Sequence, residues 1–187
     1  MNEITSKLEK LESILAKADA PVLRRLQPGL KDGEIAAFFS ENNIPTHPNL
    51  FSLYNWHNGL TSVYGDQRLT EFSPLGGFLN LNEILALRND FMTYDWFEVE
   101  NRHEYVPFLS GGEDHMHLLR VSSGEIYFSC PTIQVFCEKR FNSLSSLLDT
   151  TLKCYEIGML KMHPTGGLRA DRYYWKFQEY WKERHNH

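Results

Sequence analysis

Four short stretches with strand character follow one another between residues 105 and 137, and they constrain the fold more than any other feature of the chain. The middle two flank Ser122, Ser123 and Gly124, and a short glycine-containing turn between two strand-like runs is typical of an antiparallel hairpin. The segment therefore predicts a meander of antiparallel strands. The expected strands are 105–109, 115–121, 125–129 and 133–137.

The sequence on either side of this meander has helical periodicity. Near the N-terminus, Ile4, Leu8, Leu11 and Leu15 recur at the spacing of one helix face, with charged residues between them. Similar patterns predict helices over 32–41 and from Pro48 to about 58, the second ending at an Asn-Gly pair. With helices, strands, a helix, the meander and a last helix in order, the chain predicts an α+β fold, a mostly antiparallel sheet wrapped by helices.

Local capping signals define the starts of two further helices. Asn80 followed by Glu83 resembles a capping box and opens a helix that carries Ile84, Leu85, Leu87 and Phe91. Ser143 is a suitable N-cap for the last helix of the main domain, which we expect to reach Gly158.

The length of 187 residues suits one globular domain with a small appendage. We expect an N-terminal helix over 1–21, a main domain over 22–160 and an aromatic-rich, helical C-terminal extension over 161–187. The extension carries five basic and three acidic residues from 169 onward. Its wide apolar arc favours docking onto the domain, with contact to a partner or a second copy as the alternative.

Composition excludes several classes of protein. A formal charge of −5 and a pI near 5.9 argue against general nucleic-acid binding. No stretch approaches the roughly 20 apolar residues that span a bilayer, and the charged N-terminus does not resemble a signal peptide. Three cysteines without a C-x-x-C pair argue against a disulfide framework and a cysteine-rich zinc site. We expect a cytoplasmic protein without a cofactor or membrane contact.

Virtually all of the net charge lies between residues 90 and 114, where seven acidic residues accompany one arginine, a net of −6. Aromatic residues are interleaved with these acids, and acidic groups beside aromatic anchors suit the binding of a basic protein surface. The alternative is a solvated loop whose aromatic rings fill the core. The predicted partner-binding residues are Asp90, Asp95, Trp96, Glu98, Glu100, Glu104, Glu113 and Asp114.

Catalytic and metal-binding patterns are sparse. Glu113, His115 and His117 alternate along an expected strand, so their side chains would share one face, but no third histidine lies at ligand spacing. No nucleophile elbow, phosphate-binding P-loop or dinucleotide-binding turn occurs. We therefore predict no metal site and no catalytic residue, and rank a metal-dependent hydrolase last.

A series of short motifs resembles the SUKH superfamily, which comprises the Smi/Knr-like cell-wall regulators and bacterial toxin-immunity proteins. The motifs are a proline-glycine turn and helix start, an Ile-Pro step, a helix closing on Asn-Gly, a Leu-x-Leu-x-Glu helix start, a Val-Pro-Phe strand with a following turn, a hairpin and a last helix. They lie at 28–35, 44–45, 50–59, 78–84, 106–114, 124–127 and 141–158.

The resemblance covers about residues 22 to 160 and departs from the family in two places. Ile44 replaces the usual leucine of the Leu-Pro step, and a glutamate often found in the preceding helix has no counterpart beside Phe38 and Phe39. The resemblance implies a non-enzymatic protein-binding domain, an immunity protein that neutralises a toxin such as a nuclease. The alternative is a regulatory or scaffold protein of the cell-wall-synthesis type. Neither the partner nor the oligomeric state follows from the sequence.

Overall fold

A computed structural model describes residues 2–64, 69–71, 73, 75–93, 100–111, 115–130, 135–163 and 167–170. In this part of the chain, the α-helices are α1 (Glu3–Lys17), α2 (Asp32–Glu41), α3 (Pro48–Trp56), α4 (Leu81–Thr93) and α5 (Leu144–Glu156). The strands are β1 (Leu26–Pro28), β2 (His57–Leu60), β3 (Gly77–Phe78), β4 (Tyr105–Ser110), β5 (Met116–Arg120), β6 (Ile126–Cys130), β7 (Val135–Phe141), β8 (Leu160–Met162) and β9 (Leu168–Ala170). Short 3-10 helices cover Pro21–Arg25 and Arg102–Glu104.

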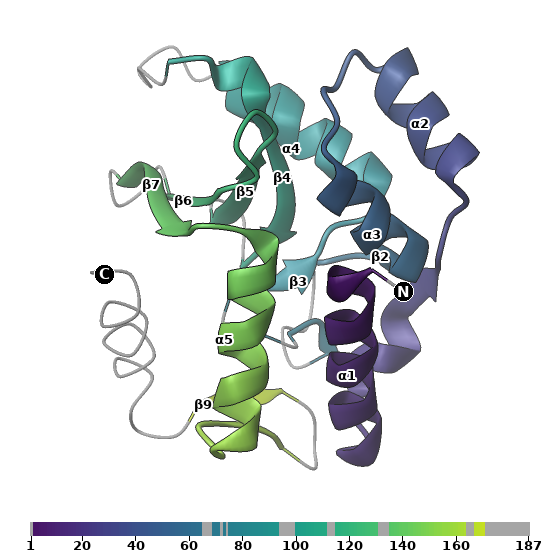
Figure 1. The fold of residues 1–187 in the computed structure, drawn as a ribbon, viewed down its shortest axis with the longest axis vertical. Helices are drawn as coiled ribbons and strands as arrows, with labels where there is room; N and C mark the ends of the chain where they lie inside the picture. Colours follow the sequence, from purple (N-terminus) through teal and green to yellow (C-terminus); the bar gives the residue numbers. More distant parts are fainter. Residues whose placement is uncertain are drawn as a thin grey trace.

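The central element is an antiparallel sheet of five strands in the order β3-β4-β5-β6-β7 (Figure 1). Each strand from β4 to β7 pairs with its neighbour in the sequence, and the β5–β6 hairpin places Leu119 opposite Ile126. The predicted meander is therefore confirmed, and so is the α+β class. The last strand extends further than expected, to Phe141, and residues 133 and 134 of the expected strand lie outside the described residues.

Successive residues of a strand point to opposite faces of the sheet, and the buried apolar residues form two separate clusters. On one face, Leu119, Ile126 and Phe141 join a large core to which all five α-helices contribute, α4 through Leu81, Ile84 and Leu87. On the other face, Leu118 packs with Tyr105, Met116 and Phe91, the last from α4. The sheet is thus enclosed from both sides.

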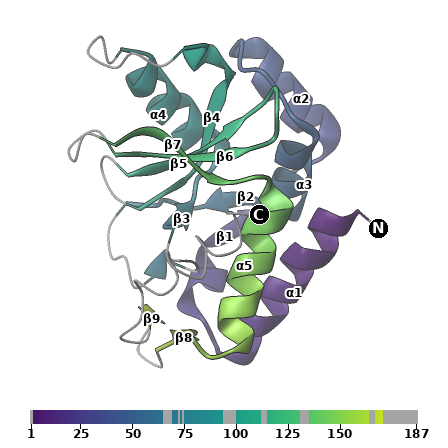
Figure 2. The same ribbon diagram turned by 60° about the vertical axis from the view of Figure 1, so that its left-hand side comes forward.

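Helices α1 and α5 lie side by side and run in the same direction (Figure 2). Ser145 Oγ donates to Glu3 at 2.7 Å, and Lys7 Nζ lies 2.8 Å from Asp149, so increasing residue numbers match along both helices. The predicted apolar stripe of α1, from Ile4 to Leu15, is buried in the large core. The N-terminal helix therefore shares its core with the expected main domain.

Local capping explains why several helix boundaries agree with the sequence. The backbone N–H of Asn80 donates to Glu83 Oε2 at 3.1 Å, and that of Glu83 donates to Asn80 Oδ1 at 3.0 Å, which is the predicted capping box of α4. Ser143 Oγ accepts from the N–H of Ser146 at the start of α5. Helix α2 spans the predicted 32–41.

The predicted end of α3 is wrong. The helix stops at Trp56, and the Asn58-Gly59 pair belongs to β2. Gly59 has φ +65°, and a Cβ on it would lie only 2.4 Å from the carbonyl oxygen of Leu79. Glycine is therefore required here by the close approach of another chain segment, and not by a helix cap.

The expected helical extension is wrong at its start. The chain leaves α5 at Gly158, which has φ +71°, and forms a hairpin in which Lys161 of β8 pairs with Arg169 of β9. The rest of the extension, 171–187, lies outside the described residues. Among the helices of the described ranges, none is long and apolar enough to cross a membrane.

Candidate interaction surface

Three of the eight predicted partner-binding residues fall in the described part of the chain, and they lie around the C-terminal end of α4 and the start of β4. They are Asp90, Glu100 and Glu104. The other five, Asp95, Trp96, Glu98, Glu113 and Asp114, lie outside the described residues.

Asp90 and Glu100 are both exposed, and neither forms an ion pair within the described residues. Beside them, the Arg102 guanidinium donates to the carbonyl of Met92 at 3.1 Å and lies 6.0 Å from the centre of the Phe91 ring. The Met92 side chain is 39% exposed. The two carboxylates and this apolar side chain remain accessible to a partner.

Glu104 is in a different situation because its carboxylate is used within the fold. It accepts a hydrogen bond from Arg120 Nε at 2.9 Å and another from the Ser122 hydroxyl. These two bonds, the one from Ser122 foremost, lower the pKa of Glu104. The side chain is only 22% exposed. Glu104 therefore anchors the β5–β6 hairpin. Its negative charge is paired with Arg120 and contributes little to the attraction of a partner.

His115 and His117, the histidines considered as metal ligands, differ sharply in exposure. His115 is exposed, whereas His117 is buried, with its ring centre 5.1 Å from that of Phe128. Burial, and next the charge of Arg140, lower the pKa of His117 to about 3, although a hydrogen bond to the backbone of Leu75 opposes the shift. Within the described ranges no group of three or more His, Cys, Asp or Glu side chains could hold a metal ion. Glu113 and Asp114 are outside these ranges.

The cysteines are present as thiols, and the pKa shift at Cys137 argues against an activated nucleophile there. Cys130 and Cys154 are buried, and none of the three, all in described segments, forms a disulfide. Burial raises the pKa of Cys137 to about 12 despite the nearby Arg102. Its thiol is protonated at neutral pH, and a thiol is a much weaker nucleophile than a thiolate.

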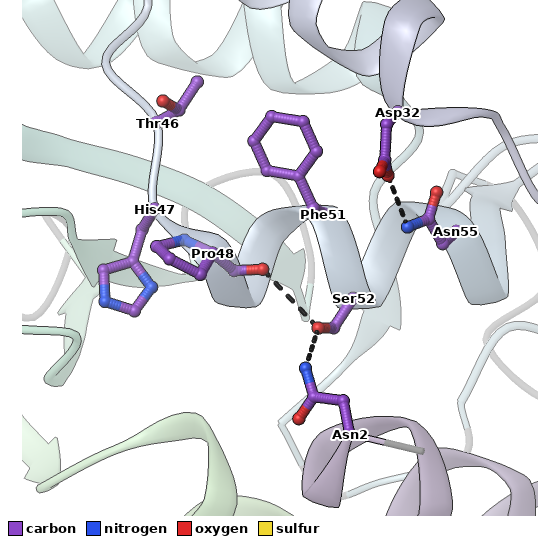
Figure 3. Close-up of a pocket in the computed structure, with 8 residues that line it drawn as sticks. All are labelled: Asn2, Asp32, Thr46, His47, Pro48, Phe51, Ser52 and Asn55. Atoms are coloured by element: carbon purple, nitrogen blue, oxygen red, sulfur yellow. Dashed lines mark hydrogen bonds between the residues drawn. The ribbon is translucent and has the colours of Figure 1, made fainter.

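A pocket of about 440 Å³ opens between the N-terminus of α1, the start of α2, and α3 with the loop that precedes it (Figure 3). This site was missed from the sequence, because its residues come from three segments that folding brings together. The lining residues are Asn2, Asp32, Thr46, His47, Pro48, Phe51, Ser52 and Asn55. The only sequence signal was the polar stretch between Pro45 and Pro48, a short connection between two helices.

Two pairs of polar side chains hold the walls of the pocket together. At one end, Asn2 Nδ2 donates to Ser52 Oγ at 2.9 Å, and Asn2 Oδ1 accepts from the backbone N–H of Ile4. At the other end, Asn55 Nδ2 donates to Asp32 Oδ1 at 2.8 Å. The Phe51 ring projects from α3, four residues before Asn55 (Figure 3).

His47 connects this pocket to the hairpin that Glu104 anchors. Its Nδ1 accepts from the N–H of Asn49 at 3.1 Å and so caps α3, and burial lowers its pKa. A Cβ on Gly124, in the β5–β6 turn, would lie 2.9 Å from His47 Nε2. The hairpin turn thus lies between the pocket wall and Glu104.

No family model matches the chain, and no curated protein matches it significantly.

Proposed function

We propose that this chain is a non-enzymatic protein-binding domain of the SUKH type, an immunity protein that neutralises a toxin. The observation that carries the proposal is the concentration of acidic residues between 90 and 114, a net of −6, of which Asp90 and Glu100 are exposed and without an ion pair in the described part of the chain. Such a patch accelerates encounter with a basic surface.

The residues that carry the SUKH resemblance support the proposal through their structural roles. A Cβ on Gly29 would lie 2.0 Å from the carbonyl oxygen of Asn55, so the proline-glycine turn is what allows β1 to pass α3. Asn58 Oδ1 accepts from the N–H of Leu81, next to the capping box of α4. The motifs thus build a scaffold, which leaves the surface of the molecule for recognition.

The protonation states of two candidate catalytic groups also favour binding over catalysis. Burial keeps His117 neutral and Cys137 protonated at pH 7. General bases and nucleophiles work best with pKa values near the operating pH, and these two are shifted away from it. The partner we expect is a basic toxin domain, such as a nuclease, whose active or substrate-binding surface this chain would cover.

The test begins with capture of the partner from a lysate of the native host on the immobilised full chain. The captured protein is then purified, its enzymatic activity is assayed, and inhibition by the chain is measured at low and high salt. We expect inhibition, and we expect it to weaken with salt because exposed charges are screened.

The variant for this test is Asp90→Lys with Glu100→Lys. Its matched control is Glu9→Lys with Glu41→Lys, which changes the total charge equally at exposed positions outside the acidic segment. We expect the first pair to weaken inhibition about tenfold at low salt and the control to have little effect. Equal effects of both pairs would show that position does not matter and would contradict the assigned surface. A captured partner without a toxic activity would instead favour the regulatory alternative.

A further inference from the structure

The Asp32 end of the pocket of Figure 3 has hydrogen-bond acceptors that no described residue engages. At the Asn2 end, both the donor and the acceptor of the amide are engaged, with Ser52 and Ile4. At the Asp32 end, one carboxylate oxygen accepts from Asn55. Within the described residues, no hydrogen bond reaches the other carboxylate oxygen of Asp32 or the side-chain oxygen of Asn55. The open end therefore presents two acceptor oxygens beside one remaining N–H of Asn55, and a ligand that engages the oxygens must supply donors.

The charge around this end of the pocket favours a cationic ligand. Asp32 contributes a carboxylate, and no lysine or arginine lines the pocket. His47 is neutral near pH 7, because burial lowers its pKa. Asn55 lies in the last turn of α3, where the helix dipole favours a cation. The positive end of α2 opposes this, but it amounts to about half a charge against the full charge of Asp32.

The third component is the half-buried ring of Phe51, which lines the same pocket and precedes Asn55 by four residues on α3, so both lie on one helix face. A planar cation can lie against an aromatic face while its N–H groups reach oxygens at the ring edge. A guanidinium combines a planar cation with a fork of five donors, whereas an ammonium is a compact point charge. The acceptor pair and the ring together suit arginine better than lysine.

We propose that this pocket binds an arginine side chain of the protein partner, with the guanidinium donating to Asp32 and Asn55 and lying against Phe51. The inference rests on the proposed function, because it assumes that the ligand belongs to a protein. The acidic segment attracts any basic surface at long range. The pocket would add one specific contact, with a single arginine of the partner.

The direct test uses small probes on the full ¹⁵N-labelled chain. N-acetylarginine amide, its lysine counterpart and its neutral isostere N-acetylcitrulline amide are titrated, and amide shifts are followed by NMR. We expect arginine to shift residues around 32 and 46–55, lysine to bind at least threefold more weakly, and citrulline at least tenfold more weakly. Asp32→Asn should reduce arginine binding at least tenfold, whereas Glu9→Gln, at an exposed position outside the pocket lining and the acidic segment, should not change it.

Shifts outside the pocket, equal shifts with citrulline, or an unchanged response in Asp32→Asn would each overturn the arginine site. Phe51→Leu tests the contribution of the ring, and it should weaken binding of the arginine probe more than binding of the lysine probe. Asp32→Asn is also measured against the captured partner. If the Asp32→Asn chain still inhibits the partner normally, the anchor is wrong and the proposed function stands. If arginine binds but no inhibited partner exists, the proposed function fails by itself.

Discussion

The junction where β2 meets α4 and the pocket between α2 and α3 both pair an asparagine with an acidic residue, yet they differ in what they leave open. At the junction, Asn80 Nδ2 donates to the carbonyl of Leu60, and the two carboxylate oxygens of Glu83 accept from the N–H groups of Val63 and Asn80. In the pocket, Asp32 and Asn55 bind each other and retain acceptors that face solvent. Polar residues at the junction therefore stabilise the fold, whereas those of the pocket are available to a ligand.

The largest expected loss of stability comes from Gly59→Ala, which disrupts the junction of β2 and α4. Alanine at this position combines a positive φ with a Cβ within 2.4 Å of the backbone of Leu79, so we expect a loss of about 3 kcal/mol or more, or failure to fold. Its matched control is Gly33→Ala in the first turn of α2 beside the pocket, where a Cβ meets nothing within 4 Å. That change should stabilise by up to about 1 kcal/mol. Urea unfolding measures both, and comparable losses would contradict the distinction.

The next effect concerns His117, whose Nδ1 is buried and accepts no hydrogen bond within the described residues. Its folded pKa of about 3 lies below the ordinary 6.5, so the unfolded chain binds one more proton between these values. Stability should therefore fall as the pH drops below about 6.5, with this residue contributing about 1.4 kcal/mol per pH unit.

His117→Gln removes the titrating group, and urea unfolding from pH 7 to pH 4 measures the result. The unfolding free energy of the variant should depend less steeply on pH than that of the wild type, whatever its stability at pH 7. Parallel pH profiles would show that the ring is not buried in its neutral form.

A smaller effect compares a hydroxyl at the junction with one in the pocket. Tyr54 is fully buried and donates to the carbonyl of Leu79 at 2.9 Å, so Tyr54→Phe should cost about 1–2 kcal/mol by leaving that carbonyl without its donor. Thr46 is exposed at the pocket rim, and Thr46→Val should change stability by less than about 0.5 kcal/mol. Thermal unfolding distinguishes the two, and a larger loss from Thr46→Val would make the pocket part of the stabilising framework.

The smallest expected effect is a difference in the pH dependence of stability between variants of two carboxylates of the acidic segment, Glu104 and Glu100. Hydrogen bonds from Ser122 and Arg120 lower the pKa of Glu104 below 4.5, so its contribution to stability is present at neutral pH and is lost as the pH falls through the folded pKa. Glu104→Gln should therefore be less stable than the wild type at pH 7, and the difference should shrink in acid. Glu100→Gln should show no such change, because Glu100 is exposed and without an ion pair in the described residues. Urea unfolding at pH 7 and pH 3 measures both, and similar profiles would contradict the distinct role of Glu104.

The sequence predicts those parts of the fold that depend on neighbouring residues. The Asn80–Glu83 capping box, the bounds of α2 and the β5–β6 hairpin all follow from signals within a few positions of each other. The end of α3 does not, because Gly59 is required by Leu79, twenty residues further on. The β8–β9 hairpin is not predicted, because the helical extension over 161–187 is assigned from the aromatic and basic residues that follow position 168, whereas the hairpin depends on the pairing of 160–162 with 168–170.

The candidate site was likewise predictable only where it depends on residues close in the sequence. The acidic excess between 90 and 114 is visible from composition, but the engagement of Glu104 depends on Arg120 and Ser122 across a strand pair. The pocket joins Asn2 to Ser52 and Asp32 to Asn55, contacts that only the packing of α1, α2 and α3 creates. Residue spacing cannot indicate such a site.

The most direct test of the central claim is a titration of the captured partner's enzymatic activity with the purified chain. The account predicts that activity falls in proportion to added chain, approaches zero at one equivalent, and recovers partly when the salt concentration is raised. A partner that forms the complex yet keeps full activity at saturation would contradict a neutralising role for this protein.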